Sequence, residues 1–316
     1  MMSDYSETTP LLVSRSSDNV KDTLNSENKD PRAERSSSSC CGPDGLGTRI
    51  IALLLMSVVG FGAFFCFDNP GALQSEMKDS LNITTSDFAS LYSWYSWPNV
   101  ILPIIGGYLI DSVLGVRRGT VIFSSLICAG QLMLGLATLY QCFWLMKVSR
   151  FLFGVGGESL NMALNTFTVT WFKDKELNMV FGFQLSLSRL GSTVNFLVME
   201  PLFRKMTEHY QGDKISGLGW SLMIAASFTL LSLISSLILN YLDKRREKHS
   251  RVTLTQADQP VSLAEIRDFP PTFWLLCLAT LAYYGSIFPF ISLAQTYFQT
   301  EYGYDEQAAN FLVGQL

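Results

Sequence analysis

Hydrophobic residues along this chain gather into long runs that are separated by short polar stretches. Six runs are long enough to cross a bilayer as helices, with approximate limits 48–67, 88–110, 120–141, 143–171, 177–203 and 218–242. A seventh run covers 271–298, and Ala308–Leu316 begins an eighth that is too short to cross. The pattern predicts an all-α polytopic membrane protein.

The polar stretches divide the chain into four parts. Residues 1–47 are rich in Ser, Asp, Asn and Lys and are predicted to be a disordered tail, because they cannot bury a core. A six-span bundle (48–242), a charged loop (243–270) and the start of a second bundle (271–316) follow. This is the plan of a two-halved transporter. Because the chain ends inside the eighth run, we expect a fragment or a shortened isoform with a complete first half.

Basic residues are distributed unequally between the loops on the two sides of the predicted spans. If the tail is cytosolic, the cytosolic loops hold more Lys and Arg than the opposite loops. This bias predicts a cytosolic N-terminus. The N-glycosylation sequon at Asn82 then lies on the opposite, lumenal side, where a sugar could be attached.

Composition narrows the class of protein further. Hydrophobic residues make up 48% of the chain and charged residues only 16%, which is typical of proteins embedded in membrane lipid. The net charge of −4 is small, and no basic block indicates binding to nucleic acid. The sequence has no metal-ligand spacing, no phosphate-binding loop and no nucleophile beside a base. We therefore expect no enzyme activity, no cofactor and no metal.

Two neighbouring spans carry charged residues at a depth where a charge is costly. Arg150 and Glu158 lie in the run 143–171, and Arg189 lies in the run 177–203. A charge at bilayer depth costs about 2.5–3.5 kcal/mol on insertion scales. These side chains are therefore expected to face a paired or water-filled interior, and the two spans to form one wall of a polar cavity.

The turn between the second and third spans carries a recognisable signature. It reads GGYLIDSVLGVRRG, and its informative positions are Gly107, Asp111, Gly115, Arg117 and Arg118. The pattern resembles the signature of the major facilitator superfamily, with Gly115 one residue later than is usual. Glycines at this point allow a tight turn and close helix contact. The resemblance implies the superfamily fold and a conformational role for this loop, which latches the two halves during alternation.

Two further positions near the lumenal side have alternative interpretations. Arg150 begins RFLFGVG, which resembles the superfamily's fourth-span pattern of Arg followed by small residues. It either supports helix pairing or takes part in gating or proton coupling. Asp68 follows the first span and precedes a Pro-Gly turn, so it either caps a helix end or takes part in gating.

Longer segments resemble a lysosomal branch of the same superfamily. They are FDNP (67–70), FGVGGESL (153–160), NTF (165–167) and RLGSTVN (189–195). The resemblance implies a place in the lysosomal membrane, export of dipeptides to the cytosol, and a heavily glycosylated single-span accessory protein as partner.

The N-terminal tail holds one short sorting pattern. Glu7 stands four residues before the pair Leu11 and Leu12. This resembles the acidic dileucine signal that clathrin adaptors read for lysosomal sorting.

Polar residues in the spans indicate how a substrate is held. Glu158, Asn161 and Asn165 share one helix face through their i, i+3, i+7 spacing, and Tyr95 and Asn99 are further candidates to line the cavity. A dipeptide carries an ammonium group at one end and a carboxylate at the other. Glu158 would bind the ammonium, and Arg189 would bind the carboxylate through its planar fork. Alternatively, Glu158 and Arg189 simply pair with each other.

Two classes of function remain open at this point. The first is a lysosomal transporter that exports dipeptides by alternating access, or one that carries another small zwitterion or an organic anion. The first span lacks the Glu-x-x-Glu-Arg pattern of proton-coupled peptide transporters, which favours uniport. The second class is a non-transporting, truncated isoform that acts by binding the accessory membrane protein.

Overall fold

The computed structural model describes residues 45–100, 102, 114–172, 175–250 and 269–314. Helices account for nearly all of this part, and none of its residues forms a strand. The predicted all-α class is therefore confirmed. Five of the candidate positions lie outside the described ranges: Glu7, Leu11, Leu12, Gly107 and Asp111.

Six long helices correspond to the six predicted spans. They are α2 (Leu46–Phe67), α5 (Thr85–Asn99), α7 (Gly115–Leu139), α8 (Phe143–Trp171), α9 (Lys175–His209) and α10 (Lys214–Ser250). The last of these continues well past residue 242, into the stretch that was predicted to be loop. Its charged end remains helical because it packs against neighbouring helices, as described below.

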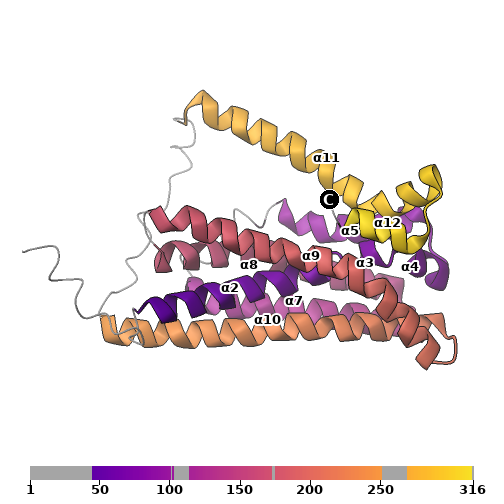
Figure 1. The fold of residues 1–316 in the computed structure, drawn as a ribbon, viewed down its shortest axis with the longest axis horizontal. Coiled ribbons are helices and arrows are strands. Elements are labelled where there is room, and N and C mark those ends of the chain that lie inside the picture. Colours follow the sequence, from indigo (N-terminus) through magenta and orange to yellow (C-terminus); the bar gives the residue numbers. More distant parts are fainter. Residues whose placement is uncertain (1–44, 101, 103–113, 173–174, 251–268, 315–316) are drawn as a thin grey trace, which may run out of the picture.

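Two short helices, α3 (Asn69–Ala72) and α4 (Gln74–Leu81), join α2 to α5. They lie at the end of the bundle farthest from the start of α2, which we call the distal end (Figure 1). The opposite end, where α2 begins and α10 finishes, is the proximal end.

Packing between helices follows a clear neighbour pattern. Helix α2 lies between α9 and α10, α8 lies between α5 and α7, and α7 also contacts α10. Glycines allow two of these approaches. A Cβ on Gly191 of α9 would collide with the carbonyl oxygen of Phe61 on α2, and one on Gly154 of α8 would collide with that of Tyr95 on α5. Close helix contact at small residues is typical of membrane bundles.

Apolar side chains cover the outer surface. On α10 the exposed large apolar side chains include Leu230, Leu231, Ile234, Leu237 and Ile238. Four described helices are long and apolar enough to cross a membrane: α2, α7, α10 and α11 (Pro271–Tyr302). Helices α8 and α9 have 29 and 35 residues but carry more polar side chains, which fits two helices that line a polar interior.

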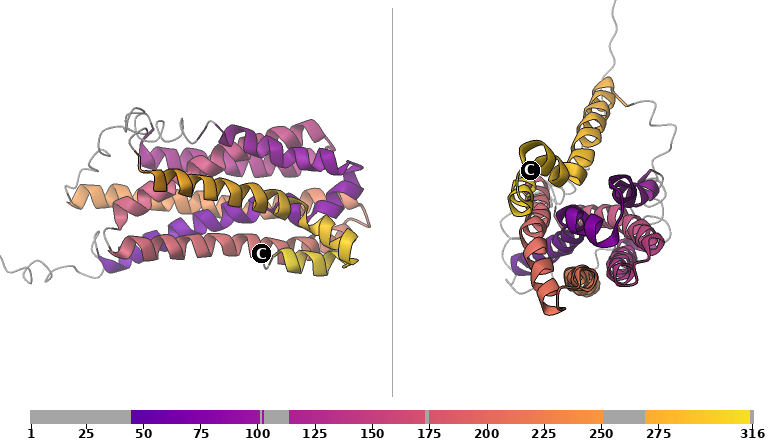
Figure 2. Two further views of the ribbon diagram at one scale, coloured as in Figure 1. Left: turned by 90° about the horizontal axis from the view of Figure 1, so that it is seen from above. Right: turned by 90° about the vertical axis from the view of Figure 1, so that its right-hand side faces the viewer.

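The start of the second half touches the bundle at one end only. Most of α11 is exposed and leans away from the six helices, whereas its last turns and α12 (Glu306–Val313) lie against the distal end (Figures 1 and 2). The buried residues of these two helices are Ala294, Gln295, Ala309, Asn310 and Val313. The described start of the second half therefore contacts the six-helix half at the distal end.

The glycine contact on α9 can be tested by substitution. Gly191→Ala is expected to lower the free energy of unfolding by about 1–3 kcal/mol, because the new methyl group would displace the α2 backbone. Gly182→Ala on the same helix meets nothing within 4 Å and is expected to leave stability unchanged or slightly higher. Thermal unfolding in detergent, followed by tryptophan fluorescence, measures both. Equal losses in the two variants would contradict this packing.

Candidate functional site

Glu158 is held on α8 by a tyrosine from α5. The hydroxyl of Tyr95 donates a hydrogen bond of 3.4 Å to Oε1 of the half-buried Glu158. Gly157 makes room for this tyrosine, because a Cβ there would lie 3.1 Å from its hydroxyl. The candidates Asn161 and Asn99 flank the pair, the first beside the Glu158 carboxylate and the second beside the Tyr95 hydroxyl. The structure thus brings four of the six predicted substrate-binding residues together.

Asn165 and Arg189, the other two, are exposed. The Arg189 guanidinium lies over the ring of Phe64 on α2, 4.9 Å from its centroid. Among the ion pairs of the described residues, none joins Glu158 to Arg189. The alternative that these two charges simply neutralise each other is therefore wrong for this conformation. Helices α8 and α9 present an anion and a cation separately.

Arg150 is the most deeply buried charge near this site, with 1% of its surface exposed. Four aromatic rings surround its guanidinium carbon at 5.4–5.7 Å, namely Phe67, Tyr92, Tyr95 and Phe153. Its Nη2 donates a hydrogen bond of 3.0 Å to the carbonyl oxygen of Phe67. Rings at this distance attract a cation through their quadrupoles. Arg150 thereby fixes the position of Tyr95, and Tyr95 in turn holds Glu158.

Asp68 lies at the junction of α2 and α3 and is 5% exposed. Asp68 occupies the C-cap position of α2, where its backbone N–H donates to the carbonyl oxygen of Phe64, and the N-cap position of α3, where its side chain makes no capping hydrogen bond. The charges of Arg150 and Arg189 both act on its carboxylate. The carboxylate of Asp68 is therefore near enough to both the buried Arg150 and the exposed Arg189 to be attracted by each.

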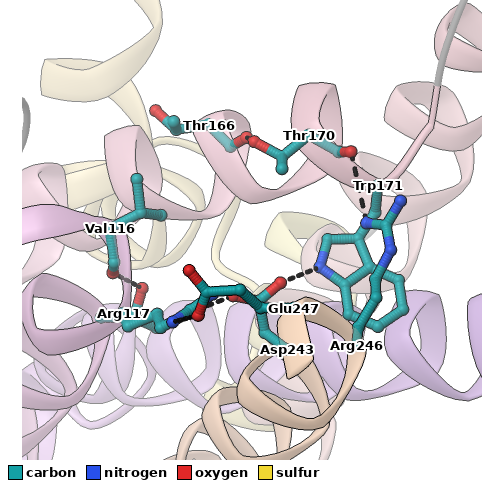
Figure 3. A network of polar contacts seen from close by, with 9 residues as sticks. Val116, Arg117, Thr166, Thr170, Trp171, Asp243, Arg246 and Glu247 are labelled. Carbon is teal, nitrogen blue, oxygen red and sulfur yellow. Dashed lines mark hydrogen bonds and ion pairs between the residues drawn. The ribbon is translucent and has the colours of Figure 1, made fainter. Parts of the chain in front are cut away.

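A second polar network lies at the proximal end (Figure 3). Arg117 on α7 forms ion pairs with Asp243 and Glu247 on α10, the latter at 2.6 Å. Asp243 also accepts a hydrogen bond of 3.0 Å from the indole nitrogen of Trp171 on α8. The guanidinium of Arg246 lies 4.8 Å from the centroid of the same indole. One buried carboxylate thus ties three helices together.

This network differs from what the sequence resemblance implied. A latch between the two halves was expected, but both described carboxylate partners of Arg117 belong to the six-helix half. Gly115 does begin α7 at a φ of +71°, a conformation that favours glycine, and Arg118 is exposed. Sequence reasoning missed Trp171 and Asp243. The one-turn spacing of Asp243 and Glu247, just past the sixth apolar run, was the available signal.

The sequon residue Asn82 is exposed at the distal end. It follows α4 in a left-handed conformation with a φ of 50°, and Thr84 of the same sequon caps α5. Its position is compatible with glycosylation on the distal side.

Comparison with known proteins now identifies the family. The sequence profile described as Major Facilitator Superfamily matches residues 52–316. The chain belongs to the Major Facilitator Superfamily. Its six-helix half with a partial second half fits the superfamily's two-halved plan, as the spans predicted.

Individual superfamily members are similar over most of this chain. The Lysosomal dipeptide transporter MFSD1 of Homo sapiens is 44% identical over 89% of this chain and 60% of its own length. The protein of that name from Danio rerio is 47% identical over 84% of this chain and 57% of its own length. The chain thus spans about three-fifths of these relatives.

Solved structures agree on the superfamily fold. The structure titled "Crystal structure of tetrameric PepTSo2 in I4 space group" matches with a TM-score of 0.55 and 15% identity, over 74% of this chain and 48% of that one. A second, "Selectivity mechanism of a bacterial homologue of the human drug peptide transporters PepT1 and PepT2", matches with a TM-score of 0.54 and 14% identity, over 85% and 51%. At such low identity these likenesses show the fold alone.

Substitutions of the two carboxylates in the proximal network are expected to lower the free energy of unfolding by different amounts. Asp243→Asn should lower the free energy of unfolding by about 2–3 kcal/mol, because it removes a charge that is 3% exposed and bonded to both Arg117 and Trp171. Glu247→Gln should cost less than about 1 kcal/mol, because that carboxylate is 39% exposed. Unfolding in increasing SDS measures the difference. A larger loss in the Glu247→Gln variant would contradict this ranking.

Proposed function

We propose that this chain forms the substrate-binding first half, and the start of the second half, of a dipeptide transporter. The observation that carries the proposal is 44% identity, over 89% of the chain, to proteins named as lysosomal dipeptide transporters. The separately presented charges of Glu158 and Arg189 support it, because a dipeptide offers one group of each sign at its ends.

Each end of the peptide has a matching group in this proposal. Glu158 binds the ammonium group, and its orientation is set by the hydroxyl of Tyr95. Arg189 binds the carboxylate through two parallel N–H groups, a geometry that Arg provides and Lys does not. Asn161, Asn165 and Asn99 offer uncharged hydrogen-bonding groups around these two. Recognition of the two ends alone leaves the peptide side chains free to vary.

Alternating access follows from the way in which the halves meet. With the N-terminus in the cytosol, the distal end faces the lumen, and the conformation described here is closed to the lumen. Arg150 and Asp68 connect the substrate site to this end. Arg150 donates a hydrogen bond to Phe67, the last residue of α2, and Asp68 follows Phe67 directly in the chain. We assign them to gating. Gly115, Arg117 and Arg118, together with Gly107 and Asp111 outside the described residues, belong to the cytosolic conformational element.

Location and partners complete the proposal. The transporter resides in the lysosomal membrane and works as a uniporter from lumen to cytosol. Its tail binds a clathrin adaptor through Glu7, Leu11 and Leu12, and a glycosylated single-span protein accompanies it. The relatives' names support the lysosomal location.

Modified substrates can assign each charge to one end of the peptide. Binding of dialanine, its N-acetyl form and its C-terminal amide to the purified chain in nanodiscs is measured by calorimetry. The unaltered protein should bind each modified peptide at least about tenfold more weakly than it binds dialanine. This corresponds to a loss of about 1.4 kcal/mol of binding free energy. Glu158→Gln should abolish the difference between dialanine and its N-acetyl form only. Arg189→Ala should abolish the difference between dialanine and its amide only.

Lys205→Ala provides the matched control, because Lys205 is an exposed cation on the same helix as Arg189. It should bind all three peptides as the unaltered protein does. If Glu158→Gln weakens dialanine and N-acetyl-dialanine by the same factor, Glu158 is structural and the proposed recognition fails.

A further inference from the structure

The contact that closes the distal end consists mainly of neutral amide groups. Gln74 accepts a hydrogen bond of 3.3 Å from the backbone of Thr296, and Ser75 donates one of 3.0 Å to Gln299. Asn310 on α12 donates one of 3.0 Å to the carbonyl oxygen of Ala72. Neutral hydrogen bonds of this kind contribute only about 0.5–1.5 kcal/mol each and can be exchanged for water. The interface is therefore suited to opening and closing.

Two carboxyl groups stand in this neutral interface. Glu76 on α4 is 5% exposed, and neither of its carboxylate oxygens has a hydrogen-bond partner among the described residues. Glu306 on α12 lines the same cleft and accepts a hydrogen bond of 3.4 Å from the side-chain amide of Gln295, so its carboxyl group stands near the unpartnered one of Glu76. Two ionised carboxylates have only acceptors and repel each other. They bond only when one of them carries a proton.

Other charges around the pair do not neutralise it. From α9, Glu200 adds a third negative charge but is bound in an ion pair with Arg204. Lys78 and Asp79 of α4 and Lys214 of α10 line the same cleft, whereas α11 contributes Thr296, Gln299 and Thr300. No ion pair of the described chain joins either lysine to Glu76 or Glu306.

The surroundings change how readily these groups ionise. Burial, and then the charge of Glu306, raises the pKa of Glu76 above its ordinary range. Burial likewise raises the pKa of Glu306. When the interface opens, water reaches both groups and their pKa values return toward about 4.3. The closed state therefore binds more protons than the open state, and acid favours closure.

We propose that Glu76 and Glu306 form a proton-binding site that closes the distal end of the transporter. The ligand is a proton. The bound proton lets one carboxyl group donate to the other across the two halves. As the pH rises through the raised pKa values, the proton is lost and the two carboxylates push α4 and α12 apart.

A consequence for transport rests on the proposed function, whereas the proton site itself does not. If the distal end faces an acidic lumen, the empty transporter rests with this end closed. Substrate binding must then supply the free energy that opens it. In a neutral compartment the same end would stay open more of the time.

Distances between spin labels test this proposal without any substrate. Ser86→Cys and Gln307→Cys place labels at exposed positions of α5 and α12, in a background where the other reactive cysteines are replaced by serine. Pulsed electron resonance in nanodiscs then gives the closed fraction between about pH 4 and about pH 10, a range that extends past the raised pKa of Glu76, which is about 9. The ratio of closed to open molecules should fall by about tenfold for each unit by which closure raises the pKa.

Uncharged variants separate this pair from other carboxylates. Glu76→Gln should stay closed at every pH, because its amide donates to Glu306 without a proton, and Glu306→Gln should behave in the same way. Glu301→Gln removes an exposed carboxylate near the end of α11. Its closed fraction should change with pH as that of the unaltered protein does. A pH-independent distance in the unaltered protein, or unaltered titration in the Glu76→Gln and Glu306→Gln variants, would overturn the proposal. Because no peptide is present, either result is independent of dipeptide binding.

Discussion

The buried guanidinium of Arg150 is the group on which the arrangement of the substrate side depends. A cation with 1% of its surface exposed loses several kcal/mol of hydration and must regain it from the protein. Here the compensation comes from a carbonyl oxygen and a ring of α2, two rings of α5 and one ring of α8. These helices are thus fixed around one charge. The same requirement holds Tyr95 where it can bond Glu158.

The two ends of the bundle use different kinds of polar contact. At the proximal end, charged groups of α7 and α10 bind each other and the indole of α8, all within one half. At the distal end, neutral polar groups join the two halves, and Glu76 and Glu306 line the same cleft. Buried ion pairs are costly to break, whereas neutral hydrogen bonds exchange readily with water. The structure therefore combines a rigid half with a separable contact between halves.

Hydrophobic runs were sufficient to predict where the six long helices lie, because a bilayer requires long apolar segments. The spacing of Glu158 and Asn161 also predicted a shared face correctly, since helical periodicity is local. The network around Asp243 and the pair of Glu76 and Glu306 were not predicted. Each joins residues that are far apart in the sequence, and run length does not determine which helix faces meet. The helical end of α10 was missed for the same reason, because Asp243 packs against Arg117 and Trp171.

The central claim is that the α8–α9 face with Glu158 and Arg189 faces water and substrate instead of lipid. The most direct test is the reaction of single cysteines with a charged thiol reagent in proteoliposomes that contain this chain. Asn165→Cys lies on the Glu158 face, and Ile234→Cys lies on the apolar surface of α10; both positions are exposed. The account predicts rapid reaction at residue 165, slowed by dipeptide, and none at residue 234. Equal reactivity at the two positions, or no reaction at residue 165, would contradict it.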